Sequence, residues 1–534
     1  MKRIAFLVFL LSAAIVAGTP PQRPKLLVFI SIDQMRADYY DRYGHLFTGG
    51  FHRLYNNGIV YSNADLNYAT SETGPGHATL GTGCYPAHSG ILSNEWIDPV
   101  TKQSVYCVDD SLAFPVDGDG GLMSARNLAV NGMGDWLKKH SPASKVISVS
   151  SKDRAAILMA RKGPDGVYWY SKKNGTMVTS SYYMKTTPAW VKSFNAAGWV
   201  AKNVPDAWTK TLPESTFRSV GPDEFAAEQQ TNGSSSFPHP FTAGKKNEQI
   251  MGTPYGDKLI VDFAIAALKG EQLGARGATD LLCISLSNCD YVGHGYGPDS
   301  HELLELLVNT DRALGALFDV LDATVGKDNY IVAQSADHAV CPLPEYNAQF
   351  RHLPAKRYIY ANDVKPKMDS LSSLLKVRIN THEDVLIKNS FLNYAAARAD
   401  GWDSLRLEQE VATGLLNVDA FVNVYFRREL TGTAPSSKPF MEKYRNSYYA
   451  PRGEDFQYLV REYCIISSKP TGTTHGTPYT YDTHVPLLFW WNGANASKVA
   501  RPVHSADAAP TLARFAGVPV PAGIDGVPLT EVAR

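Results

Sequence analysis

Five separated hydrophobic segments, each bordered by a charged or metal-binding residue, constrain the fold of this chain most strongly. They are KLLVFISID ending at Asp33, KVISVSSKDR with Lys152 and Arg154, LLCISLSNCD ending at Asp290, NYIVAQSADH ending at Asp337 and His338, and THVPLLFWW with His484. Short apolar runs of this kind are typical of strands buried on both faces of a parallel sheet. In open α/β sheets the functional site lies beyond the carboxyl ends of the strands. Four segments carry their polar residue at that end, whereas His484 precedes its strand and must arrive from a loop.

The chain has 534 residues, of which 44% are hydrophobic, which is enough for one α/β sheet with long insertions. Residues 160–250 are rich in Tyr, Trp, Gly and Ser, and residues 342–456 mix helical stretches with Pro-rich loops. Both lie between the segments that carry candidate site residues. We therefore expect a single catalytic domain over residues 19–534, in which the two regions are insertions that roof the site.

One βαβ unit is expected between Asp290 and Asp337. The strand LLCISLS is followed by a Gly-rich loop, in which Asp299 or Ser300 can cap a helix whose leucines recur at helical spacing. Gly326 then ends the helix before the strand NYIVAQS. Such a right-handed connection predicts that the two strands are parallel.

The N-terminus predicts export. Lys2 and Arg3 precede an apolar run over residues 4–16 and two small residues, which is the pattern of a signal peptide at residues 1–18. The run is too short to span a bilayer comfortably, and no other stretch is long and apolar enough to do so. With 52 basic and 52 acidic residues, net charge does not favour nucleic acid or an anionic membrane as partner. We expect a periplasmic or secreted protein.

Six cysteines fit an oxidising compartment. We favour a disulfide between Cys84 and Cys107, because both flank the candidate nucleophile loop. The alternative is that several cysteines are free and buried. No two cysteines form a CxxC pair, so a thiolate zinc cluster is not expected.

Three carboxylates and three imidazoles at the ends of these segments form a candidate metal site. They are Asp33, Asp290, His294, Asp337, His338 and His484. Each alone is a weak signal, since a carboxylate and a histidine four residues apart are common by chance. Together they are enough for two metal ions with open positions, and zinc is the metal that such oxygen and nitrogen ligands suit best.

The candidate nucleophile lies in TSETGPGHATLGTG, residues 70–83. Thr73 precedes Gly-Pro-Gly and a helical stretch, so its hydroxyl would lie at a helix N-terminus, which favours a bound anion. It could equally be a simple N-cap threonine. Spacing alone does not separate Thr73 from Ser71 or Thr79.

Lys152 and Arg154 flank Asp153 at the end of a predicted strand. Positions i and i+2 of a strand point the same way, so both cations can face one anionic ligand. An exposed charge cluster is the alternative. Asn94, in SNEW, adds a neutral donor.

In eight ordered motifs the chain resembles the alkaline phosphatase superfamily, and most closely its phosphate-irrepressible periplasmic alkaline phosphatases with a threonine nucleophile. The motifs are SIDQMRADY, SETGPGHATLGTG, GILSNEW, SSKDRAAI, NCDYVGHGYGP, QSADH, HGTPYTYDTHVPLLFW and DAAPTL with GVPVP and DGVPL. The resemblance implies a three-layer α/β/α sandwich. It also implies a zinc-dependent hydrolase of small phosphate monoesters that acts through a phosphothreonine, and we expect it to be a monomer.

The resemblance also implies a role for each site residue. Thr73 would be the nucleophile, and Asn94 would donate to a phosphoryl oxygen. One of two zinc ions would be bound by Asp290, His294 and His484, and the other by Asp33, Asp337, His338 and the Thr73 oxygen. Lys152 and Arg154 match the phosphate-binding Lys-x-Arg of the monoesterases.

Two alternatives differ in testable features. Nucleotide pyrophosphatase/phosphodiesterases share the Thr and Asn but lack the Lys-x-Arg pair. A monoester carries about two negative charges and a diester about one, so two extra cations favour the monoester. A secreted protein that binds phosphorylated ligands without catalysis would lack a metal ligand or the nucleophile, but every expected position is filled here.

Overall fold

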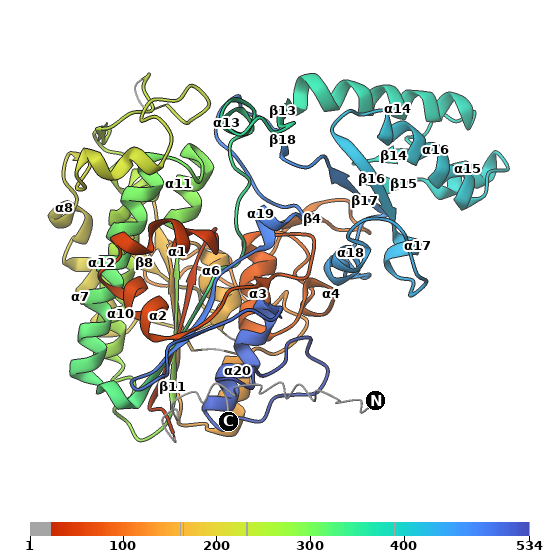
Figure 1. The fold of residues 1–534 in the computed structure, drawn as a ribbon. Coiled ribbons are helices and arrows are strands. Elements are labelled where there is room, and N and C mark those ends of the chain that lie inside the picture. The colour runs from red at the N-terminus through yellow and green to blue at the C-terminus, as the bar shows by residue number, and fades with distance from the viewer. Residues whose placement is uncertain (1–22, 161, 164, 231–232, 389, 533–534) are drawn as a thin grey trace, which may run out of the picture.

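The computed structural model describes residues 23–534 except 161, 164, 231–232, 389 and 533–534. The signal-peptide prediction for residues 1–18 lies outside the described residues. A sheet lies at the centre of the molecule (Figure 1). It has nine strands in the order β20-β2-β19-β12-β1-β11-β6-β7-β8. Among the described residues, no helix is both long and apolar enough to cross a membrane.

Five neighbouring strands of the sheet are parallel. They are β12 (Tyr330–Ser335), β1 (Leu26–Ile32), β11 (Asp280–Leu286), β6 (Val146–Ser150) and β7 (Gly166–Ser171). The antiparallel strands are β19 (Leu487–Trp490) and, at the edge, β8 (Thr176–Val178), while β2 (Ile59–Tyr61) and β20 (Ser497–Val499) run with the parallel set. The prediction of a mostly parallel α/β sheet is confirmed.

Helices cover both faces of the sheet. Along β1, Leu26, Val28 and Ile30 enter one hydrophobic cluster, whereas Leu27 and Phe29 enter another. The first cluster lies under α2, α10 and α12, and the second lies under helices that include α5 and α20. Their bounds are α2 (Gly50–Asn57), α10 (Pro254–Gly270), α12 (His301–Thr324), α5 (Met133–His140) and α20 (Ala508–Phe515). The alternation of neighbouring residues between two cores produces the expected three-layer sandwich.

The expected βαβ unit forms from β11, α12 and β12, and Ser300 rather than Asp299 is the N-cap, since its Oγ accepts the Leu303 N–H (3.2 Å). The strands β11 and β12 are parallel, as predicted. They are not neighbours, however, because β1 lies between them and pairs with both. This places the ends of three site-bearing strands side by side.

The two predicted insertions differ in how they join the sheet. The first contains β7 and β8, which extend the sheet at one edge. The second forms a lobe at the upper right of Figure 1, with a hydrophobic core of its own. Its elements include α14 (Lys365–Arg378), α16 (Ser404–Leu416) and β16 (Phe421–Phe426). Strand β17 (Phe456–Val460), which begins at the last residue of the predicted insertion, pairs with β16. One catalytic domain with two insertions stays a prediction.

All six cysteines are buried and free, so the favoured Cys84–Cys107 disulfide is not formed. The reason is helix α3 (Thr73–Thr82), a ten-residue helix that spans about 15 Å. Cys107 packs near its first turn, where its Sγ is 3.2 Å from an ideal Cβ built at Gly74, whereas Cys84 follows its last turn. This separation exceeds the reach of a disulfide.

The first insertion buries a carboxyl group, Glu228, which is 4% exposed. Burial, together with the charge of Glu302, raises the pKa of Glu228 to about 10. The folded protein therefore holds a proton that the unfolded chain releases above the ordinary pKa of 4.5. Because the unfolded state then binds fewer protons, this residue lowers the free energy of unfolding as pH rises from about 4.5 toward about 10.

Glu228→Gln should therefore stabilise the protein at alkaline pH. We expect its thermal midpoint to exceed that of wild type at about pH 9 by a shift equivalent to about 1 kcal/mol or more, with little difference near pH 5. Glu224→Gln, at an exposed carboxylate four residues away, is the control. If Glu228→Gln shifted the thermal midpoint equally at both pH values, the raised pKa of Glu228 would be contradicted.

Candidate active site

Five of the six predicted metal residues come together at the carboxyl edge of the parallel strands, and His484 does not join them. Asp33 directly follows β1, and Asp337 and His338 follow β12. Asp290 and His294 lie on α11 (Asn288–Tyr296), the short helix that begins just after β11. The side chains of Asp33, Asp337 and His338 are fully buried, so they face the interior of the protein rather than solvent.

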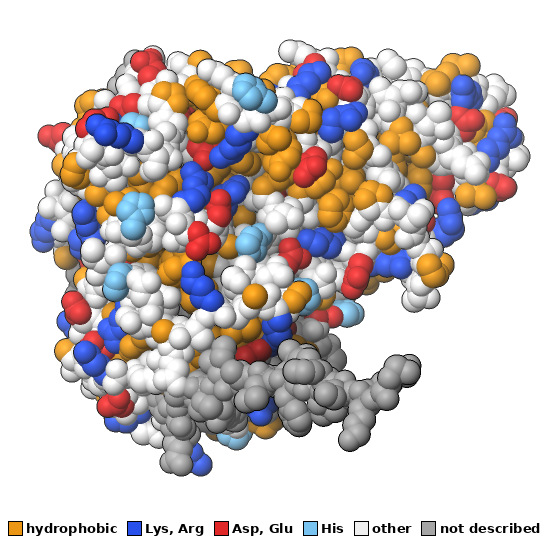
Figure 2. Space-filling view, in the orientation of Figure 1, with side chains coloured by type: hydrophobic (Ala, Val, Ile, Leu, Met, Phe, Trp, Pro, Cys, Tyr) orange, Lys and Arg blue, Asp and Glu red, His pale blue; other side chains and the backbone are white. Residues whose placement is uncertain are grey.

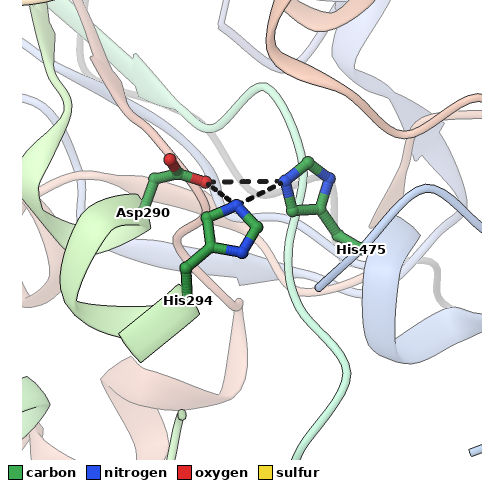
Figure 3. Close-up of side chains that lie close together, drawn as sticks. All are labelled: Asp290, His294 and His475. Atoms are coloured by element: carbon green, nitrogen blue, oxygen red, sulfur yellow. Dashed lines mark hydrogen bonds and ion pairs between the residues drawn. The ribbon is translucent and has the colours of Figure 1, made fainter. Parts of the chain in front are cut away.

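Asp290, His294 and His475 form one compact cluster (Figure 3). His294 Nε2 is 3.2 Å from Asp290 Oδ1, and His475 Nε2 is 3.5 Å from the same oxygen. The two Nε2 atoms are 3.2 Å apart. Three ligand-type atoms therefore converge on one point from a helix and from a loop almost two hundred residues away.

Hydrogen bonds on the other ring nitrogens explain how the cluster is oriented. Nδ1 of His294 donates to Thr473 O (2.8 Å), and Nδ1 of His475 donates to Ser71 O (2.6 Å). Since a carbonyl only accepts, each Nδ1 carries its hydrogen, so in the neutral form of each ring the Nε2 lone pair faces the other ring. Burial would lower the pKa of His475, but the Asp290 carboxylate raises it. The place where Asp290 Oδ1 and the two Nε2 atoms meet therefore favours a bound cation. Metal-binding histidines are commonly oriented by a hydrogen bond from the other ring nitrogen to a carbonyl.

The structure corrects the assignment of His484. Its Nε2, the atom that His294 and His475 turn toward Asp290, is bonded instead to Ser62 O (3.0 Å). A backbone bridge to Asp65 fixes the residue in this orientation just before β19. His475 takes its place in the cluster. His475 opens the quoted motif HGTPYTYDTHVPLLFW, so its position was visible in the sequence, but adjacency to the strand favoured His484.

A second set of ligand atoms lies beside the first. His338 Nε2 is 3.5 Å from Asp33 Oδ1 and 3.4 Å from Asp337 Oδ2, while its Nδ1 donates to Ala339 O (3.0 Å). These three atoms have no hydrogen-bond partner within the described part of the chain, although all are buried. Burial lowers the pKa of His338 to about 3, against the opposing charge of Asp337, so its ring is neutral. Carboxylate oxygens that accept no hydrogen bond from the described residues, beside a neutral imidazole, fit a metal ion.

Lys152 connects the two sets. Its Nζ is 2.6 Å from Asp33 Oδ2 and 2.6 Å from Asp290 Oδ2. Burial alone would lower the pKa of this ammonium group, but the charges of Asp290 and Asp33 raise it above its ordinary value. Lys152 therefore holds its proton more tightly than a free lysine does, and it brings a cation to the site.

Thr73 is the first residue of α3, with Glu72 as the N-cap, so it is not the capping threonine. Its Oγ1 is 3.4 Å from Lys152 Nζ and 3.4 Å from Arg154 Nη2. The strand argument for these cations is wrong, because β6 ends at Ser150 and Arg154 lies in the first turn of α6 (Asp153–Ala160). A turn and a helix start, not strand alternation, aim both cations at Thr73.

The other hydroxyls that spacing left open lie elsewhere. Ser71 Oγ donates to Thr477 O (3.0 Å) and accepts the Gly476 N–H (3.1 Å), so it supports the loop that carries His475. Thr79 Oγ1 is buried two turns into α3 without a hydrogen-bond partner among the described residues. Only Thr73 of the three contacts the cations described above.

Asn94 is held beside the start of α3. Its Oδ1 accepts the Gly74 N–H (2.7 Å), which leaves the amide NH₂ to donate elsewhere. Glu72 Oε2 accepts both the Asn94 N–H (2.7 Å) and the Ser93 hydroxyl (2.8 Å). Glu72 is thus a positioning residue for Asn94, which the motif reading missed.

Gln34 and His77 were also missed. Gln34 donates its backbone N–H to Asp337 Oδ1 (3.1 Å) and its side-chain amide to Asp290 Oδ1 (2.8 Å), so it joins the two metal sets. His77 lies 3.2 Å from Asp337 Oδ2, one helical turn after Thr73. Both lie within quoted motifs, SIDQMRADY and SETGPGHATLGTG. The residue types Gln and His do not by themselves distinguish a residue that supports the site from an ordinary polar residue.

Comparison with known proteins agrees with this geometry. Residues 27–422 match the family model for type I phosphodiesterase / nucleotide pyrophosphatase, so the chain belongs to this family of the alkaline phosphatase superfamily. It is 34% identical over 527 residues to the alkaline phosphatase PhoV of Synechococcus elongatus, covering 96% of this chain and 93% of that protein. It is 32% identical over 526 residues to the alkaline phosphatase PafA of Elizabethkingia meningoseptica, covering 96% and 94%. The family predicted from eight motifs is confirmed.

A crystal structure of wild-type PafA matches the fold with a TM-score of 0.88 at 31% sequence identity, covering 96% of this chain and 99% of that chain. The match extends over both insertions, so the second lobe is part of the shared architecture. Basic and acidic side chains are interspersed over the face shown in Figure 2, in keeping with the zero net charge.

Proposed function

We propose that this protein, an alkaline phosphatase by its family and relatives, hydrolyses phosphate monoesters with two zinc ions and a phosphothreonine intermediate at Thr73. The observation that carries the proposal is that two carboxylate–imidazole sets lie beside one hydroxyl that faces two cations. We propose Asp290, His294 and His475 as ligands of one ion. For the other ion we propose Asp33, Asp337 and His338, with the Thr73 oxygen.

Two zinc ions in such a site would supply Lewis-acid stabilisation of the attacking and leaving oxygens. The side chains of the protein would provide the nucleophile and would bind the phosphoryl group. Thr73 Oγ1 would attack phosphorus and form the O–P bond while the bond to the leaving alcohol breaks, and water would then hydrolyse the phosphothreonine. Lys152 and Arg154, both within 3.4 Å of Oγ1, would bind the non-bridging oxygens, on which the charge of the loose transition state is spread.

The same cations favour the monoester over the diester. Lys152 is buried and charged, and Arg154 offers a planar fork to phosphoryl oxygens. A monoester carries about one negative charge more than a diester, so it gains more from two cations within 3.4 Å of the nucleophilic oxygen. The signal-peptide pattern further supports a periplasmic or secreted location.

Metal content tests the proposed ligand sets. We expect about two zinc ions per chain in the purified wild-type protein, and about one in His475→Ala, because that cluster loses one of three ligands. His484→Ala is the matched control and should retain both ions. Equal retention in the two variants, or loss of metal only in His484→Ala, would contradict the placement of His475.

A further inference from the structure

Two neighbouring parallel strands each lead into a lysine at the site edge. Lys152 follows β6 and contacts Thr73. Lys172 follows β7, the next strand in the sheet, directly after its last residue Ser171. Because the carboxyl ends of adjacent parallel strands lie side by side, Lys172 is placed one strand outward from the phosphoryl-binding cation.

The ring of Tyr291 is in contact with both of these lysines. Its centroid is 5.2 Å from Lys152 Nζ and 4.7 Å from Lys172 Nζ. The two ammonium groups are therefore within about 10 Å of each other, and a cation–π contact holds the outer one over the ring. Tyr291 directly follows the proposed metal ligand Asp290, so this contact lies at the rim of the site.

The backbone around Lys172 is fixed, while its charge is not neutralised. Gly175 N–H donates to Ser171 O (2.8 Å), and Ser171 Oγ donates to Asp119 Oδ2 (2.8 Å), which closes the turn between β7 and β8. Lys172 is exposed. Within the described ranges it forms no ion pair with a carboxylate. An ammonium group beside an anion-binding site is thus left available to a ligand.

We propose that Lys172 binds a second negative charge, carried by the leaving group of the substrate. This rests on the proposed function and narrows its substrate class to phosphate monoesters whose alcohol bears a further carboxylate or phosphate. The reacting phosphoryl group lies against Thr73, Lys152 and Arg154, and the remote anion lies against Lys172. The contribution is modest because the ammonium is exposed and screened by water.

A pair of near-isosteric substrates tests this, 4-carboxyphenyl phosphate and the uncharged 4-carbamoylphenyl phosphate. We expect Lys172→Ala to lower the ratio of their kcat/KM values by about three- to fivefold, and Lys172→Glu to lower it by about tenfold or more. Lys172→Arg should retain most of the ratio. Added salt should lower the ratio more in wild type than in Lys172→Ala, since the variant lacks the exposed ammonium group that salt screens.

Lys173→Ala is the control, because this exposed neighbour has the same charge but, in the part of the chain that the structure describes, forms no cation–π contact with Tyr291. A ratio unchanged in Lys172→Ala, or lowered equally in Lys173→Ala, overturns the proposal. Failure of wild type to turn over either ester would instead overturn the proposed function, so the two failures are distinguishable.

Discussion

Thr73→Ala should lower kcat/KM for an aryl phosphate by about ten-thousandfold or more, since it removes the atom that accepts the phosphoryl group. Thr73 Oγ1 is positioned at the start of α3, with Lys152 Nζ and Arg154 Nη2 each 3.4 Å away. Thr73→Ser should recover much of the activity, because it keeps the hydroxyl. Steady-state rates of the three proteins provide the measurement.

Thr79→Val is the matched control, since it removes a hydroxyl from the same helix where that group has no hydrogen-bond partner among the described residues. It should retain activity within about threefold. Acid quenching during turnover should also trap phosphate on wild type and not on Thr73→Ala. Phosphate found on Ser71 or Thr79 instead would show that Thr73 is not the nucleophile.

Replacing Lys152 and Arg154 together with Ala should lower kcat/KM for an aryl phosphate monoester by about a thousandfold. Turnover of the corresponding methyl diester should fall by about tenfold or less, because the diester offers one negative charge fewer to these cations. Rates of one aryl monoester and its methyl diester, measured on both proteins, check the prediction.

Metal content must be compared in the same samples, because Lys152 also contacts two proposed metal ligands, Asp33 and Asp290. With metal retained, equal losses for monoester and diester would refute the charge argument. That result would favour the alternative function, hydrolysis of phosphate diesters, which the description of the matching family suggests.

The fold was largely predictable from the residue pattern. Runs such as those around β1 and β12 are apolar on both faces, and only a sheet covered by helices on both sides buries them. The neighbours in the sheet were not predictable. Strand β1 lies between β11 and β12 although it precedes both by many residues, because the order of parallel strands is set by how helices pack over them.

The candidate site was predictable in composition but not in every member. Spacing alone did not separate Thr73 from Ser71. The family resemblance indicated Thr73, and the contacts that each hydroxyl makes support that choice. The unformed Cys84–Cys107 disulfide shows the same limit, since closeness along the chain says little about distance across a helix.

Residue types and their order were sufficient to establish the sheet, the family and the carboxylate, imidazole and cationic groups of the site, because burial and ligand chemistry are properties of side chains. Only the folded chain could choose His475 over His484. The direction of an imidazole depends on which carbonyl holds its second nitrogen, and those carbonyls, Ser71 O and Ser62 O, come from distant segments.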